Sequence, residues 1–449
     1  MESEHYFLKH LDFRKERLPL RYLGLPLIAS RLTMLDCQPL LQKIDARMRG
    51  WDGVGLSFAG RVQLIKSVLL AFEVYWAMAF LLPKGVIKEI VKRIRTFLWK
   101  GNSSSGYPKV AWESVCKPIE EGGQGIRDIL ALNRSLMSRH LWSVIKHEKE
   151  SIWVEWIAYY RLRDASIWTV NAKRGAWSWR KMLELRGTLL PHIQLKIGTG
   201  ESFSLWHDPW HNLGPLILRF PRGPQLTGTT PMATLSEVIE DNRWSWPLIT
   251  DIAHLEIIQN LPSIHTGCNV ITWDSNGGEF TNAAAYHLFR PPRPKVGWHS
   301  LFLSPFKIPR NSFILWLAIL GRLSTMDKQW LQHLDGHCLL CTDGSLETHD
   351  HLFFACRFSR LCLGPSEHTS DSTGLMWIGN VASCGPRPDG EERNFRKFQH
   401  KTRAPSIIGS LVIEEVKRRI LSASLHHSIS TQGLYRLWQI PWPVEGNAS

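Results

Sequence analysis

Apolar residues recur at every third or fourth position through most of the first 165 residues, and this spacing predicts a series of amphipathic helices. One such helix is predicted over residues 38–49. A second begins at Ser57, whose hydroxyl makes it a good N-cap residue. Pro83 separates it from a third helix, because proline disrupts a helix interior. The apolar side of that third helix is formed by Val86, Ile87, Ile90, Val91, Ile94, Phe97 and Leu98.

The polar side of this third helix is strongly basic. Its cations, here called the basic ridge, extend over about three turns and are Lys84, Lys88, Lys92, Arg93 and Arg95. Such a ridge can face the phosphates of a nucleic acid, which attract clustered Lys and Arg side chains. It can equally be the solvated face of an ordinary amphipathic helix. The pattern by itself leaves both interpretations open.

Helical spacing returns over residues 127–165 and weakens beyond them. The segment GTGESFSLWHDPW at 198–210 predicts a short hairpin or strand, Pro-rich stretches flank a small middle domain, and helical spacing reappears at 311–334. We therefore expect a mainly α fold. Its predicted parts are a basic helical region at 1–165, a small mixed α/β connector at 166–280, a small cysteine-containing module at 281–365, a flexible linker at 366–404 and a C-terminal helix at 405–424.

The charge of the chain is unevenly distributed. The 449 residues carry a formal net charge of +14, and residues 1–200 hold 32 Lys and Arg against 18 Asp and Glu. The remaining residues are nearly balanced, so the basic excess belongs to the predicted helical region. A concentrated positive field favours polyanionic partners, of which nucleic acid is the most common. A surface charge that only increases solubility is the alternative.

The composition also predicts the cellular compartment. Residues 1–12 are polar and charged, unlike a signal peptide, and the eight cysteines are too sparse for a secreted disulfide scaffold. The most apolar stretch, residues 68–82, is short for a membrane span and is interrupted by Glu73, which predicts a buried helix. We expect an intracellular protein, nuclear or cytoplasmic, that is not secreted and has no membrane partner.

A cysteine-rich segment, HCLLCTDGSLETHDHLFFAC at 337–356, predicts a zinc site. Cys338 and Cys341 have the spacing of a zinc knuckle, and His351 and Cys356 follow as a second pair. Three thiolates and one imidazole suit tetrahedral Zn²⁺, and four protein ligands leave no position for a catalytic water. The predicted zinc is therefore structural.

Other ligand sets remain open on spacing alone. His337, His349 and Cys362 lie close enough in sequence to compete for the metal. Reduced thiols without a metal are a further alternative. A redox pair is disfavoured, because no thioredoxin-like βαβ pattern surrounds the two cysteines of the knuckle.

Catalytic motifs are not evident in this sequence. It contains no adjacent pair of aspartates for two-metal phosphoryl transfer, and no P-loop, GxSxG or HExxH motif. His207-Asp208 resembles part of an acid–base pair, but Pro209 and the neighbouring aromatic residues favour a packed structural corner. The glycines of EGGQG at 121–125 favour a tight turn over a phosphate-binding loop, because no Lys-Ser or Lys-Thr follows them.

These segments together resemble the C-terminal half of plant LINE-type (non-LTR) retrotransposon reverse transcriptases over residues 15–425. The cysteine segment is similar to the reverse-transcriptase zinc-binding domain, with Glu347-Thr348 before a His-Leu-Phe-x2-Cys ending, which favours His351 over His349. The remaining matches are LRYLGLPL at 20–27 (like the primer grip), LSFAGRVQLIKSVL at 56–69, FLWKG at 97–101, KVAWESVCKP at 109–118 and EGGQGI at 121–126 with Asn133 (like a helical thumb), and LWHDPW at 205–210 (like the connector).

The resemblance implies a function without polymerase chemistry. The family's aromatic-x-Asp-Asp motif lies upstream of Tyr-Leu-Gly, here only about 20 residues from Met1, so the palm carboxylates are expected to be absent. The endonuclease and ribonuclease H domains of relatives are not evident either. We expect a truncated, non-catalytic remnant that binds structural zinc and, independently of sequence, RNA or DNA. Trp51, Trp99 and Trp112 can stack on bases, although core packing is favoured for them. The alternatives are a zinc-stabilised protein-interaction module and a product with no selected function.

Overall fold

The fold is described from a computed structural model. It describes residues 18, 20–28, 30–51, 54–100, 107–148, 150–163, 165–173, 175–246, 252–274, 278–290, 292–302, 309–323, 325–327, 336–341, 343–363, 396 and 402–422. The chain divides into two compact units, each assembled from segments far apart in the sequence. The first unit is Met1–Ala46, Leu70–Val91 and Asp128–Pro292, and the second is Arg47–Leu69, Lys92–Arg127 and Arg293–Ser449. The consecutive domain boundaries expected from the sequence stay predictions.

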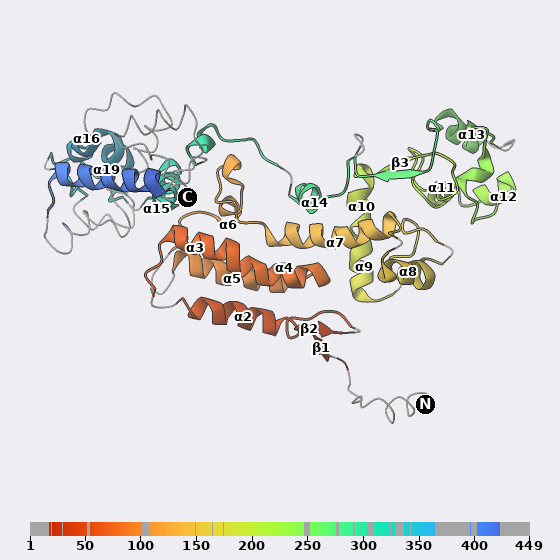
Figure 1. The fold of residues 1–449 in the computed structure, drawn as a ribbon, viewed down its shortest axis with the longest axis horizontal. Helices are drawn as coiled ribbons and strands as arrows, with labels where there is room; N and C mark the ends of the chain where they lie inside the picture. The colour runs from red at the N-terminus through yellow and green to blue at the C-terminus, as the bar shows by residue number, and fades with distance from the viewer. Residues whose placement is uncertain are drawn as a thin grey trace, which may run out of the picture. The chain divides into compact units, whose positions relative to one another are not determined.

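Helices dominate both units, which confirms the mainly α fold. The longer helices are α2 (Gln38–Arg49), α3 (Phe58–Leu64), α4 (Leu70–Ala79), α5 (Lys84–Trp99), α7 (Ile129–Ile145), α8 (Ile152–Ile157), α9 (Trp177–Leu183), α13 (Ile252–Gln259), α14 (Asn282–Phe289), α15 (Pro309–Ile319), α16 (Arg357–Leu363) and α19 (Pro405–Ser422) (Figure 1). The shorter helices and turns are η1 (Ile65–Leu69), α6 (Trp112–Val115), η2 (Ile119–Glu121), η3 (Ala158–Leu162), α10 (Arg186–Leu189), η4 (Leu190–His192), α11 (Leu216–Arg219), α12 (Gly223–Thr227), η5 (Leu235–Val238), η6 (Gly297–Phe302) and η8 (His351–Ala355).

Strands are short and pair into three two-stranded antiparallel sheets within the described residues. These are β1 (Leu20–Tyr22) with β2 (Leu25–Leu27), β3 (Gln194–Lys196) with β6 (Val270–Thr272), and β4 (Ile239–Glu240) with β5 (Arg243–Trp244). In the first sheet Tyr22 pairs with Leu25 across a two-residue turn. Both turn residues, Leu23 and Gly24, have positive φ angles, as a type I′ hairpin turn requires.

The segment 58–79 forms one continuous helix, because the π-helical turn η1 joins α3 to α4. Its N-cap is Ser57, whose Oγ accepts a hydrogen bond from the N–H of Gly60 at 3.2 Å. By length and composition alone this helix could cross a membrane. About two fifths of its most apolar window is buried within the structure, including Leu69, Glu73 and Ala77.

Helix α7 is the central helix of the first unit and packs beside α4 and α14. Its buried Asn133 donates hydrogen bonds to the carbonyl oxygens of Ala77 and Phe80 and accepts one from the N–H of Leu82. The amide therefore satisfies backbone groups at the end of α4 that have no partner within α4 itself. A core of large side chains lies along the rest of α7, with Trp142 stacked on Phe280 and edge-on to Trp273.

Three local expectations are corrected by the structure. The predicted helix at 311–334 ends at Ile319, because Gly321 adopts a left-handed conformation and the N–H of Arg322 bonds to the carbonyl of Leu317, which closes the helix. The residues after 327 in that prediction lie outside the described part, as do most of 366–404. Residues 198–210 form turns with one isolated bridge, Ser204 to Thr234, rather than a hairpin.

Helical spacing at 127–165 also belongs to more than one element. Helix α7 ends at Ile145 and α8 begins at Ile152, with His147 between them in the left-handed region. By contrast, the predicted helix at 38–49 has the bounds of α2, and the predicted C-terminal helix is present as Pro405–Ser422.

Candidate metal centre

A tight loop in the second unit presents the first two cysteines. The N–H of Cys338 bonds to the carbonyl of Ser345, and the N–H of Glu347 bonds to that of Gly336. The loop turns at Gly344, whose φ of +64° lies in the region that favours glycine. Cys338 and Cys341 are thereby held on the same loop, as the knuckle spacing predicted.

Backbone N–H groups of this loop point at the two sulfur atoms. Cys338 Sγ accepts hydrogen bonds from the N–H groups of Leu340 and Cys341, and Cys341 Sγ accepts one from the N–H of Asp343. The contact with Cys356 and burial raise the pKa of Cys338, and burial raises that of Cys341. Each N–H bond acts in the opposite direction, because it stabilises the thiolate. The loop thus supplies donors for the thiolates that a metal ion would require.

The second pair comes from a helical segment that follows the loop. His351 begins the π-helical turn η8, and Cys356 lies between η8 and α16, with its N–H bonded to the carbonyl of His351 at 2.6 Å. Cys356 Sγ accepts hydrogen bonds from the N–H groups of Phe358 and Ser359 in the first turn of α16. Those N–H groups have no partner within the helix itself, so a thiolate satisfies them.

The four ligand atoms converge. Cys338, Cys341, His351 and Cys356 each offer one atom, and all four atoms lie within 4.8 Å of one another. Cys338 Sγ is 3.9 Å from Cys356 Sγ, and Cys341 Sγ is 3.3 Å from His351 Nε2. Zinc–sulfur bonds of about 2.3 Å and zinc–nitrogen bonds of about 2.0–2.1 Å in a tetrahedron separate ligand atoms by about 3.6–3.8 Å. The donor set and its spacing fit a tetrahedral Zn²⁺.

Burial makes this a closed site. Cys338, His351 and Cys356 are buried and Cys341 is half-buried, while Leu340 and Leu352 pack in the same module. A hydrogen bond from Cys338 lowers the pKa of Cys356 to about 4, and the same contact and burial raise the pKa of Cys338. Cys338 thus keeps the proton in this contact, and a metal ion would displace it.

The rival ligands have different surroundings. His337 Nδ1 is 2.7 Å from the carbonyl oxygen of Gly344 and is engaged in holding the loop. His349 lies outside the group of atoms that converge, and the side chain of Cys362 lies outside the described residues. Geometry therefore brings His351, rather than His337 or His349, to the three cysteines.

One supporting residue was missed by the sequence analysis. Arg396 donates hydrogen bonds to the carbonyl oxygens of Leu339 and Leu340 in the knuckle, at 3.1 and 2.8 Å. Its guanidinium also lies 4.4 Å from the ring centroid of Phe358 in α16. Arg396 thus ties together the two segments that carry the ligands. No local pattern could have indicated it, because it lies 40 residues beyond Cys356 within the predicted linker.

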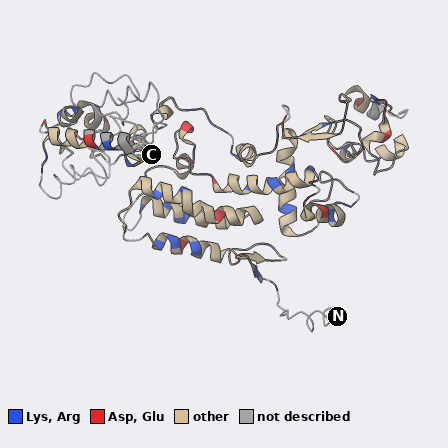
Figure 2. Cartoon of the chain, in the orientation of Figure 1, with Lys and Arg blue, Asp and Glu red and all other residues tan. Residues whose placement is uncertain are grey.

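The basic ridge lies along α5. Lys84, Lys88, Lys92 and Arg95 are exposed, and Arg93 is half-buried. Figure 2 marks the Lys and Arg residues of the chain in blue. The apolar side of the same helix is buried, as its spacing predicted. Phosphate binding by this ridge stays a prediction.

The aromatic residues considered for stacking belong to the core. Trp99 and Trp112 are buried, and Trp51 packs against Phe97 with ring centroids 5.4 Å apart. The favoured interpretation, core packing, is the one that their surroundings support.

His207 and Asp208 form a structural corner in the first unit. Asp208 accepts hydrogen bonds from the hydroxyl of Ser166 and the N–H of Ser204, and His207 Nδ1 is 2.8 Å from Thr169 Oγ1. Burial raises the pKa of Asp208 and lowers that of His207. These bonds fasten the 204–208 turn to residues 166–169, as the corner interpretation expects.

The glycine-rich turn at 121–125 is likewise structural. A Cβ atom at Gly123 would lie 2.0 Å from the carbonyl oxygen of Lys117, and the carbonyl of Gly122 accepts a hydrogen bond from Trp316 Nε1. The close approach of the backbone explains the need for glycine here.

Comparison with known proteins agrees with the metal centre. Residues 280–362 match the family model for zinc-binding in reverse transcriptase. This segment contains all four converging ligands. A relative from Arabidopsis thaliana, which carries the name of a ribonuclease H protein, is 28% identical over 352 residues, covering 74% of this chain and 56% of the relative. The chain thus spans about half the length of this curated relative. This chain contains a reverse-transcriptase zinc-binding domain, and the two matches are consistent with a retrotransposon-derived protein. They confirm the resemblance found in the sequence.

Proposed function

We propose that this chain is a non-catalytic part of a retroelement reverse transcriptase, in which a structural zinc ion organises one module and a basic helical region binds nucleic acid. The convergence of three thiols and one imidazole within 4.8 Å is the observation that carries the proposal. Its family match supplies the setting, because the matched domain is one found in reverse transcriptases.

The zinc would be held by Cys338, Cys341, His351 and Cys356. Bound there, it would stabilise the fold by joining the knuckle to the η8–α16 segment, and four protein ligands would leave it no open position for substrate. The residues themselves prepare the site: N–H groups stabilise the thiolates, and Arg396 holds the knuckle carbonyls in place. A structural role follows from this closed arrangement.

The nucleic-acid partner is supported by charge. The exposed cations of α5 follow one helix face, so several can approach consecutive phosphates of one backbone. Contacts of this type depend little on base sequence, since phosphates are the same at every position. RNA and DNA are both proposed partners.

A salt titration tests the nucleic-acid part. Fluorescence anisotropy with a labelled duplex should show affinity falling steeply between 50 and 200 mM salt, with a logarithmic slope of about −0.9 for each phosphate neutralised. Replacing Lys84, Lys88 and Arg95 together by Ala should weaken binding at least tenfold and reduce the slope by about 2–3. Replacing three exposed cations elsewhere, Lys173, Lys196 and Arg243, is the charge-matched control and should change affinity much less.

Several outcomes would contradict the proposal. Affinity that ignores salt over this range, or that falls equally in both triple variants, would favour a zinc-stabilised protein-interaction module. Primer extension, or cleavage of an RNA–DNA hybrid, by the purified chain would overturn its non-catalytic part.

A further inference from the structure

Helix α8 and the turn η3 expose an unusual number of aromatic residues. We call this surface the aromatic face. It consists of four rings, Trp153, Trp156, Tyr159 and Tyr160, with the neighbouring Ile152, and these side chains are between 40% and 84% exposed. Most of the described tryptophans elsewhere in the first unit are buried in its cores. Large aromatic side chains left in water commonly mark a binding surface.

The aromatic face is held firmly from beneath. Val154 and Ile157, on the opposite side of the same segment, are buried in the core along α7, and the hydroxyl of Ser151 accepts a hydrogen bond from the N–H of Val154. The exposed rings therefore stand on an anchored helix. Their exposure is a property of the folded unit.

The rings form a connected group with a cation. Trp156 and Tyr160 have centroids 5.4 Å apart, and Tyr159 meets Tyr160 edge to face at 4.7 Å. The guanidinium of Arg161 lies 5.6 Å from the centroid of Trp156. Rings and guanidinium planes accept stacked bases of any sequence, and Arg adds attraction for phosphate.

A cavity begins where the aromatic face ends. Its volume is about 490 Å³, and it is lined from one side by Leu162 and Arg163, which directly follow Arg161 in the chain. This volume lies in the range of about 300–1,000 Å³ that holds small ligands, and a single nucleotide is of that size class. The lining is mixed, with apolar Val144, Phe203 and Met232 beside polar Ser202, Glu201 and Thr234.

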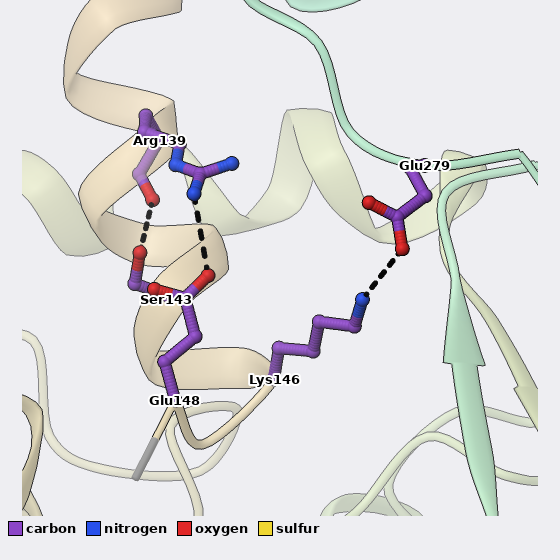
Figure 3. Close-up of polar contacts among 5 residues, drawn as sticks. All are labelled: Arg139, Ser143, Lys146, Glu148 and Glu279. Carbon is purple, nitrogen blue, oxygen red and sulfur yellow. Dashed lines mark hydrogen bonds and ion pairs between the residues drawn. The ribbon is translucent and has the colours of Figure 1, made fainter. Parts of the chain in front are cut away.

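Two residues that line the cavity have unusual backbone conformations. Arg163 and His147 both line it, with φ angles of +44° and +50° in the region disfavoured for residues with a Cβ. Such conformations cost free energy and often occur at functional sites. Nearby cations are already engaged: Arg139 pairs with Glu148, and Lys146 with Glu279 (Figure 3).

We infer that the aromatic face and the adjoining cavity bind single-stranded nucleic acid, with bases stacked on Trp156, Tyr159 and Tyr160, a nucleotide in the cavity, and Arg161 and Arg163 beside the phosphates. This inference rests on the proposed nucleic-acid function and assigns it a second surface, on the first unit. It differs from the basic ridge in its chemistry. The ridge supplies charge alone, whereas the aromatic face requires bases that are free to unstack.

The test compares single and double strands. The full-length chain is titrated with labelled 12-nucleotide oligothymidine and with a 12-base-pair duplex. Replacing Trp156 and Tyr160 together by Ala should weaken single-strand binding at least tenfold, with less than a twofold effect on the duplex. Trp156→Phe with Tyr160→Phe should stay within threefold of the parent, because phenyl rings still stack. Tyr107→Ala removes an exposed ring elsewhere and should have no effect.

Further variants keep the inference falsifiable. Tyr159→Ala removes the most exposed ring of the face, so its own loss of single-strand affinity is informative even if the double variant folds poorly. Arg163→Ala should reduce the salt slope for the single strand by about 0.7, the value of one phosphate contact. Unchanged oligothymidine affinity in the Ala variants would overturn the inference, as would an effect limited to self-association in sedimentation.

The two proposals fail in different ways. If the α5 variant loses binding and the aromatic variants keep it, the aromatic face is not the single-strand surface while the proposed function stands. If the parent chain binds neither probe, the proposed function fails and the inference fails with it.

Discussion

The Oδ1 atom of Asn133 accepts a hydrogen bond from the backbone N–H of Leu82 at 2.8 Å, although the two residues are 51 positions apart. The Nδ2 atom of the same side chain donates to two carbonyl oxygens at the end of α4. One buried amide thus satisfies three backbone groups that would otherwise be shut away from water, and couples α7 to the segment that follows α4.

Replacing Asn133 by Ala should therefore destabilise the first unit by roughly 2–4 kcal/mol, because a buried backbone group without a partner costs about 1–3 kcal/mol. Urea unfolding followed by circular dichroism measures this. Ser143→Ala is the control on the same helix, since it removes only a surface bond to the carbonyl of Arg139 (Figure 3). Equal stability of the two variants would contradict the role given to Asn133.

Glu73 predicts a distinctive pH dependence. Burial, with a smaller effect of Asp128, raises the pKa of its carboxyl from 4.5 to about 8, and neither of its oxygens has a hydrogen-bond partner among the described residues. Between these two pH values the folded chain keeps a proton that the unfolded chain has released. The free energy of unfolding should consequently fall as pH rises through this window, by at most about 1.4 kcal/mol per pH unit.

Glu73→Gln should remove this dependence, because the amide does not titrate. The variant should equal the parent near pH 5 and exceed it in stability at pH 8, as measured by urea unfolding at several pH values. The exposed Glu240→Gln serves as the control and should leave the profile unchanged. A Glu73→Gln profile with the parent's slope would show that the carboxyl is ionised throughout.

The metal ligands can be tested by zinc content. Cys341→Ser and His351→Asn should each abolish the retention of one zinc per chain in elemental analysis, because a structural site needs all four donors. His349→Asn and Cys268→Ser should retain the metal, since neither residue belongs to the converging group. Full zinc retention by Cys341→Ser would show that Cys341 is not a zinc ligand.

Zinc binding should also release protons. Cys338 carries a raised pKa and is protonated before the metal arrives, so zinc must displace its proton. Affinity should therefore decrease as pH is lowered from 8 to 6, and calorimetry in buffers of different ionisation enthalpy should report proton release. Binding without proton exchange would contradict a protonated Cys338 in the metal-free chain.

Arg396 should increase the zinc affinity although it supplies no ligand atom. Arg396→Ala removes both hydrogen bonds to the knuckle carbonyls and should lower zinc affinity about 10-fold, within the 10–100-fold typical of residues that support metal ligands. Competition with a chromogenic chelator measures this. Arg322→Ala, which removes an exposed arginine elsewhere in the second unit, is a suitable comparison, and an equal loss there would indicate a general charge effect.

Several features followed from the sequence by itself. The bounds of α2, the N-cap at Ser57 and the buried side of α5 came from local periodicity and capping chemistry, which depend on residues only a few positions apart. The shared loop of Cys338 and Cys341 was expected from their spacing for the same reason. The choice of His351 needed more, since spacing left its rivals open and only the family resemblance favoured it.

Tertiary structure decided which side chains meet and which are buried, because local sequence patterns do not determine burial or long-range contacts. It brought His351 Nε2 within 3.3 Å of Cys341 Sγ and placed Arg396 against a knuckle more than 50 residues away. It buried Trp99 while leaving Trp156 44% exposed. A side chain becomes core or surface according to what packs over its helix, and that is a property of the whole folded unit.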